Sequence, residues 1–178
     1  EAVISHEYGH YLSWAASRDD SPGGSHDGTP TDPRLAWSEG LATFLSLHLL
    51  GLDVYVDTRE SGTLVREPEL YEEQANPQAG MNQELSEFLV LGFLWDVADP
   101  VSGAADPLAR PLSDVIAVLT GYLPSDGMED RGFWGVDLVD FLDGWLCQGL
   151  GDQAGLSTLL SGVSFPYDFT GPSAPCPK

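Results

Sequence analysis

Residues 1–18 read EAVISHEYGHYLSWAASR, and this stretch decides both the expected fold and the expected chemistry. Its apolar side chains recur at intervals of three and four residues, which predicts a buried α-helix. The helix contains an H-E-x-x-H motif, in which His6 and His10 lie on one face, a turn from each other. Glu7 is rotated by about 100° from His6 about the helix axis, so it does not join the two histidines as a ligand. Two imidazoles at this spacing can share one metal ion, so we predict that His6 and His10 are metal ligands.

A second helix is predicted over residues 33–50, PRLAWSEGLATFLSLHLL, in which apolar side chains predominate. Asp32 suits the N-cap, Pro33 suits the first helical position, and Gly51 marks the end. Glu39 stands among these apolar residues. A buried carboxylate without a partner loses its hydration, so a nearby cation is its natural compensation. The alternative is that Glu39 faces solvent on an amphipathic helix.

The rest of the chain predicts a mainly α fold, a single compact helical domain over residues 1–178 with little or no β-sheet. Glycine and proline residues make 19–33 an inserted surface loop between the first two helices. The other expected elements are a short strand or hairpin within 52–65, helices over 67–74, 81–97, 112–122, 136–147 and 156–160, and a Pro- and Gly-rich tail over 162–178.

The overall charge excludes two classes of partner. Seven Lys and Arg residues against 28 Asp and Glu residues give a net charge of −21, which repels nucleic-acid phosphates and anionic lipid surfaces. No stretch approaches the roughly 18 apolar residues that a membrane span needs. We therefore expect no nucleic-acid partner and no membrane span.

The two cysteines, Cys147 and Cys176, can form one disulfide that closes the C-terminal tail, and two free thiols are the alternative. Together with the strong acidity and the few lysines, this favours a secreted or cell-envelope protein. The sequence lacks an initiator Met and a signal-peptide pattern. We expect it to be the C-terminal part of a longer chain.

Residues 3–14, VISHEYGHYLSW, resemble the active-site helix of the gluzincin zinc metallopeptidases, which include thermolysin and the aminopeptidase N group. Residues 36–45, AWSEGLATFL, resemble the second helix of that family, where an E-G-x-A segment brings the third zinc ligand. The resemblance is confined to about residues 1–50. It implies that His6, His10 and Glu39 hold one zinc ion and that Glu7 is the general base. Three protein ligands leave a position open for water, as in catalytic zinc sites.

The resemblance implies zinc-dependent hydrolysis of a peptide or protein substrate. Gluzincins place a β-sheet subdomain before the active-site helix, and its edge strand aligns the substrate. The resemblance therefore also implies an upstream segment of the same protein. The alternatives are a catalytically inactive, zinc-stabilised binding or scaffold module derived from a peptidase, and a metal-free helical interaction domain.

The sequence offers candidates, with alternatives, for the residues that orient the metal ligands and stabilise the oxyanion. Asp96, in the apolar segment GFLWDVADP, is a candidate to accept a hydrogen bond from a ligating imidazole, and a contact with backbone or an arginine is its alternative. Tyr55, Tyr71 and Tyr122 are candidates to stabilise the oxyanion of the reaction, and spacing does not choose among them.

Other polar residues are expected to be structural or solvated. His48 lies half a turn away from Glu39, so it faces elsewhere. His26 is a possible fourth ligand, but solvation in its surface loop is favoured. The acids that compete with Glu39 lie in a polar stretch that favours solvation: Glu67, Glu69, Glu72 and Glu73. A solvated acidic face is favoured over a calcium site for Asp126, Glu129, Asp130, Asp137, Asp140 and Asp143.

Overall fold

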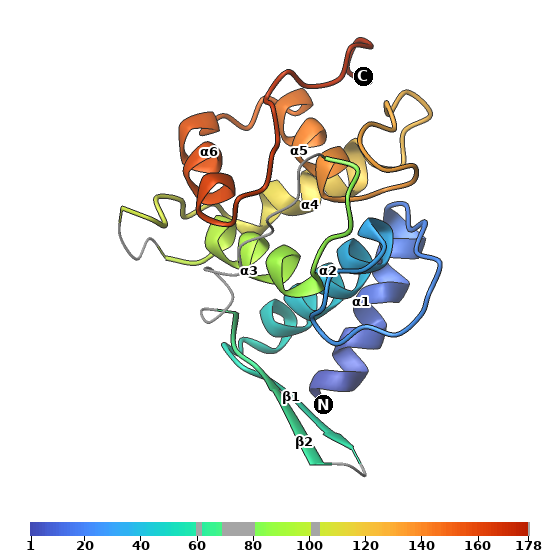
Figure 1. Cartoon of the computed structure of the whole chain (residues 1–178), viewed down its shortest axis with the longest axis vertical. Helices are drawn as coiled ribbons and strands as arrows, with labels where there is room; N and C mark the ends of the chain where they lie inside the picture. The colour runs from blue at the N-terminus through green and yellow to red at the C-terminus, as the bar shows by residue number, and fades with distance from the viewer. Residues whose placement is uncertain (60–61, 69–80, 101–103, 178) are drawn as a thin grey trace.

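A computed structural model of the chain describes residues 1–59, 62–68, 81–100 and 104–177 (Figure 1). The protein is mainly helical, as predicted. Its elements in order are α1 (Ala2–Ala16), α2 (Pro33–Leu50), β1 (Tyr55–Arg59), β2 (Gly62–Arg66), α3 (Glu87–Ala98), α4 (Leu112–Gly121), α5 (Leu138–Cys147) and α6 (Gln153–Gly162). Within the described ranges, no helix combines the length and apolar content that crossing a membrane requires.

Helix α2 is the centre of the core, and its bounds are those predicted. Asp32 caps it by accepting a hydrogen bond from the backbone N–H of Arg34, and Gly51 ends it in the left-handed conformation, at φ 63°. Trp37 and Phe44 on α2 are completely buried. Helix α2 lies between α1 and α3 and packs against both (Figure 1).

Two glycines let these helices approach closely. A Cβ atom on Gly9 of α1 would lie 2.9 Å from the Cα atom of Ala42 on α2. A Cβ atom on Gly40 of α2 would lie 2.7 Å from the carbonyl oxygen of Glu87 at the start of α3. Real Cβ atoms do not come so close, so backbone contact at both points requires glycine. Both glycines are neighbours of predicted site residues.

The predicted hairpin is present, and β1 and β2 form an antiparallel two-stranded sheet. Tyr55 pairs with Arg66, and Asp57 pairs with Leu64. Since side chains alternate between the faces of a strand, these four residues share one face of the hairpin. The hairpin projects from the helical body beside the N-terminal end of α1 (Figure 1).

Helix α3 begins at Glu87, later than the predicted start at residue 81. The reason is a β-bridge between Thr31 and Leu85, which ties the loop before α2 to the segment before α3. Ser86 then caps α3 by accepting a hydrogen bond from the N–H of Phe88. The helix expected over residues 67–74 falls largely outside the described residues.

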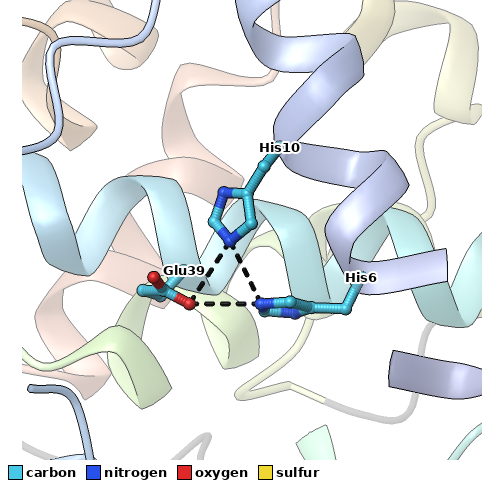
Figure 2. A group of neighbouring side chains, drawn as sticks. All are labelled: His6, His10 and Glu39. Carbon is cyan, nitrogen blue, oxygen red and sulfur yellow. Dashed lines mark hydrogen bonds and ion pairs between the residues drawn. The ribbon is translucent and has the colours of Figure 1, made fainter. Parts of the chain in front are cut away.

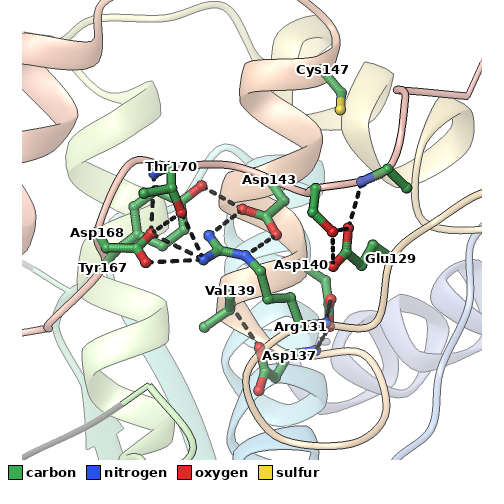
Figure 3. A network of polar contacts seen from close by, with 12 residues as sticks. Glu129, Arg131, Asp137, Val139, Asp140, Asp143, Cys147, Tyr167, Asp168 and Thr170 are labelled. Carbon is green, nitrogen blue, oxygen red and sulfur yellow. Dashed lines mark hydrogen bonds and ion pairs between the residues drawn. The ribbon is translucent and has the colours of Figure 1, made fainter.

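The disulfide between Cys147 and Cys176 is confirmed, with their Cα atoms 5.4 Å apart. A polar network also holds the C-terminal segment against α5 (Figure 3). Arg131 donates two hydrogen bonds to Asp143, at 2.7 and 2.8 Å, and contacts both carboxylate oxygens of Asp168, at 3.0 and 3.2 Å. Tyr167 donates to Asp143 as well.

The prediction of a solvated acidic face is wrong for Asp137, Asp140 and Asp143, because at most 1% of each residue is exposed. Asp137 and Asp140 form the capping box of α5, in which each carboxylate accepts a hydrogen bond from a backbone N–H. The guanidinium of Arg131 neutralises Asp143. These acids stabilise the fold through partners that charge counting along the sequence does not reveal.

Replacing Arg131 with Met should lower the free energy of unfolding by roughly 3–5 kcal/mol, because Asp143 would stay buried without its cation. The measurement is a urea unfolding curve. Arg18→Met is the control, since the pair of Arg18 with Asp20 is partly exposed and should contribute less than about 1 kcal/mol. Equal effects of the two substitutions would contradict the role of the network.

Gly9→Ala should also destabilise the protein, by about 1–3 kcal/mol, because α1 must move away from the backbone of Ala42. Helix propensity alone would predict a gain of up to about 1 kcal/mol. Gly162→Ala in α6 is the matched control, since nothing lies within 4 Å of the added methyl group. Unfolding curves in which Gly9→Ala is as stable as Gly162→Ala would contradict the close contact.

Candidate metal centre

Three predicted ligands meet between α1 and α2, and their donor atoms form a compact triangle (Figure 2). The Nε2 atoms of His6 and His10 are 3.1 Å apart. The Oε2 atom of Glu39 lies 3.2 Å from Nε2 of His6 and 3.4 Å from Nε2 of His10. Only 13% of the Glu39 side chain is exposed, so it points into the protein rather than into solvent.

The size of this triangle suits a small divalent ion. Ligands at about 2.0–2.1 Å from a tetrahedral zinc ion are about 3.3–3.4 Å from one another. The three measured separations lie close to that value. The groups could therefore hold one metal ion with little movement of their side chains.

The other ring nitrogens of the two histidines are held by hydroxyl groups. Nδ1 of His10 lies 3.1 Å from Oγ of Ser38, and Ser38 donates its only hydroxyl proton to Asp19 at 2.8 Å. Ser38 must then accept from Nδ1 of His10, which leaves Nε2 of the neutral ring with its lone pair toward the triangle. Nδ1 of His6 contacts the hydroxyl of Thr43 at 3.1 Å.

Asp96 was a candidate to accept a hydrogen bond from a ligating imidazole, with a contact to backbone or an arginine as the alternative, and it does not lie at the site. It is buried in α3 and is not among the described residues that line the cleft around the histidines. The hydroxyl groups of Ser38 and Thr43 occupy that position instead. Both come from α2, one residue before and four residues after Glu39, so the helix that brings the carboxylate also orients both rings.

The local charges favour an ionised Glu39. Burial opposes its ionisation, but its contacts with His10 and His6 outweigh burial and lower the pKa of Glu39 to about 2. The same contact raises the pKa of His10. Glu39 is thus an anionic group at neutral pH, as a ligand of a divalent cation requires.

His26 was expected to be solvated, and that expectation is wrong. The loop between α1 and α2 folds back so that Nδ1 of His26 lies 2.8 Å from Glu87, and Nε2 lies 3.5 Å from Oε2 of Glu39. Glu87 also binds Arg66 of β2 at 3.2 Å. His26, Glu39 and Glu87 form a second group that could hold a metal ion, and it shares Glu39 with the first.

Glu87 was not found from the sequence. The sequence placed it within the helix predicted over 81–97, shortly after the polar residues Asn82, Gln83 and Glu84, so nothing in the local pattern distinguished it. Gly40 lets α3 approach α2 closely enough to bring Glu87 near Glu39. Burial, as the largest influence, raises the pKa of Glu87.

A cleft of about 570 Å³ surrounds the triangle. Glu7 lines it and is exposed to solvent. Tyr55 lines it as well, whereas Tyr122 is buried away from it and Tyr71 lies outside the described residues.

His48 lies apart from the cleft, as expected, with its Nδ1 atom 3.2 Å from the backbone oxygen of Phe44. Of the competing acids, Glu67 does not line the cleft and the other three lie outside the described residues.

Comparisons of the chain with protein-family models, with curated proteins and with solved structures found no significant match. The class of the site therefore rests on its own geometry. In a mainly helical protein, two imidazoles on one helix and a carboxylate on the next point their donor atoms at one another in an open cleft.

Glu39→Ala should weaken zinc binding by more than about a hundredfold, since even groups that only orient ligands contribute about 10–100-fold. His26→Ala should change the zinc affinity by no more than a few-fold, because His26 belongs only to the second group. Competition with a chromogenic chelator measures both affinities. Loss of zinc in His26→Ala with retention in His10→Ala would place the ion in the second group instead.

Proposed function

We propose that the protein is a zinc-dependent peptide hydrolase in which His6, His10 and Glu39 hold one zinc ion. The observation that carries this proposal is the triangle of donor atoms, 3.1–3.4 Å on each side, at the wall of an open cleft that Glu7 also lines. A metal held by three protein groups keeps a position open for water or substrate, which is typical of catalytic rather than structural zinc. The resemblance of residues 1–50 to gluzincins supports the same function.

A bound zinc ion supplies Lewis acidity, which polarises the peptide carbonyl and lowers the pKa of water to about 7. Glu7 takes the proton from the attacking water and delivers it to the leaving amine. It is suited to this role because it lies on α1 beside the two histidines but is outside the donor triangle. Its exposure in the cleft leaves its carboxylate accessible to both water and substrate.

The neighbouring groups keep the ligands in their reactive form. Ser38, fixed by Asp19, accepts a hydrogen bond from Nδ1–H of His10, so the Nε2 lone pair faces the metal position. The hydroxyl of Thr43 lies beside Nδ1 of His6 in the corresponding way. This arrangement spares the site the entropy cost of ordering its ligands when the ion binds.

Two hydrogen-bond donors in the cleft are candidates to stabilise the developing oxyanion. Tyr55, one of the three tyrosines considered from the sequence, lies with its ring centre 5.7 Å from that of His6. His26 is the second, and its contact with Glu87 fixes the ring in the cleft. A donor held in place before the reaction lowers the barrier because it need not reorganise.

The disulfide between Cys147 and Cys176 supports a further part of the proposal, that the protein works outside the reducing cytosol, secreted or in the cell envelope. The net charge of −21 supports a peptide or protein substrate over a nucleic acid.

Glu7→Gln should abolish peptide hydrolysis and leave about one zinc ion bound per chain, because the amide cannot accept the proton from water. Hydrolysis of a quenched fluorescent peptide library and elemental analysis measure the two properties. His10→Ala is the control that should lose both zinc and activity. Wild-type turnover by Glu7→Gln would refute the assignment of the base. A zinc-loaded wild-type protein that cleaves no peptide would support the scaffold alternative.

A further inference from the structure

The end of the cleft beside the C-terminus of α1 contains an exposed aromatic ring that the proposed reaction does not use. Trp14 is 71% exposed and lines the cleft. It follows His10 by four residues on the same helix, so the two side chains lie on one face, a turn apart. Because Trp14 lies at the wall of the cleft, its indole is accessible to a ligand that enters the cleft.

A carboxylate lies at the same end of the cleft. Asp19 follows α1 closely in sequence and accepts hydrogen bonds from the backbone N–H of Ser21 at 2.9 Å and from the hydroxyl of Ser38 at 2.8 Å. Both donors are neutral, so they orient the carboxylate without cancelling its charge. The nearby cation, Arg18, pairs with Asp20 instead, at 2.8 Å.

The surroundings add further negative potential. Across the described residues, the cleft is lined by the carboxylates of Glu7, Asp19, Glu39, Asp57 and Glu87 and by a single guanidinium, that of Arg66. Arg66 is already paired with Glu87 at 3.2 Å. The C-terminal end of a helix is also the negative end of its dipole, and the last turn of α1 has no basic residue.

We propose that Trp14 and Asp19 form a subsite for a cationic side chain of the substrate, a lysine or an arginine. This inference rests on the proposed function for the identity of the ligand as a peptide. The indole offers a cation–π surface, and the carboxylate offers an ion pair. The two groups together recognise a positive charge on an apolar stem, which lysine and arginine share.

The distance between the subsite and the metal ligands indicates which residue of the substrate the subsite binds. One helical turn, about 5.4 Å, separates Trp14 from the metal-binding His10. An extended peptide advances about 3.3 Å per residue, so the cationic residue lies one or two positions from the bond that is cleaved. An N-terminal α-ammonium group has the same charge and is the other possible source of the cation.

Peptide binding to zinc-loaded Glu7→Gln protein tests the subsite without requiring hydrolysis. The probes are N-acetylated, C-amidated hexapeptides with lysine at each position in turn, and their counterparts with norleucine, which has the same stem but no charge. The proposal predicts that lysine at one position binds about five- to tenfold tighter than norleucine. Adding Trp14→Ala or Asp19→Asn should reduce this ratio to nearly one.

The ratio is taken within each protein, so any change in zinc affinity from Asp19→Asn affects both peptides equally. Trp134→Ala is the matched control, because Trp134 is 74% exposed and does not line the cleft. It should leave the ratio unchanged. Equal binding of lysine and norleucine peptides, no binding of either, or an unchanged ratio in Trp14→Ala would overturn the subsite. Hydrolysis of these peptides by the wild-type protein would still support the proposed function in those cases.

A third set of peptides, with a free N-terminus and no lysine, separates the two sources of the cation. Tight binding of the acetylated lysine peptides supports the side-chain subsite. A preference that appears only with a free N-terminus would overturn it and assign the cation to the α-ammonium group of the substrate.

Discussion

The contact between the backbones of α1 and α2 is the constraint on which the rest of the site depends. His6 and His10 reach Glu39 because Gly9, between them on the helix, allows α1 to lie against Ala42. A side chain at that point would separate the helices, and the donor triangle would open by a similar amount. Gly40 has the same effect on the other face of α2, where it admits Glu87. The absence of a side chain at Gly9 and at Gly40 therefore sets the distances between site residues on α1, α2 and α3.

The arrangement of side chains around the contact between α1 and α2 follows from the charges of the carboxylates that lie there. Three carboxylates lie in or near the triangle. Glu39 is one of its corners, Glu87 lies beside it, and Asp19 lies behind Ser38. Each of them accepts a hydrogen bond or forms an ion pair. His26 lies between Glu87 and Glu39 and fastens the long loop to the site. Carboxylates this close repel one another unless positive groups intervene. A divalent cation in the triangle is consistent with this distribution of charge.

The sequence predicted the features that depend on local pattern. The bounds of α2, the hairpin and the disulfide followed from caps, β-branched residues and cysteine count, and the positions of His6 and His10 followed from helical periodicity. It failed where partners come from distant segments. His26 was assigned to solvent because loop residues usually are. Asp96 was a candidate partner of a ligating imidazole, and the roles of Ser38 and Thr43 were not predicted, because they depend on how α1 packs against α2. The burial of Asp137, Asp140 and Asp143 required Arg131 and the capping box, which only the fold brings together.

The most direct test of the account is the position of the metal ion. Crystals of the zinc-loaded protein, with diffraction measured on both sides of the zinc absorption edge, locate the ion by its anomalous scattering. We predict one zinc ion per chain, about 2.0–2.1 Å from Nε2 of His6, from Nε2 of His10 and from a carboxylate oxygen of Glu39. An ion bound by His26 and Glu87 without the two histidines of α1, or crystals that take up no zinc, would contradict the account.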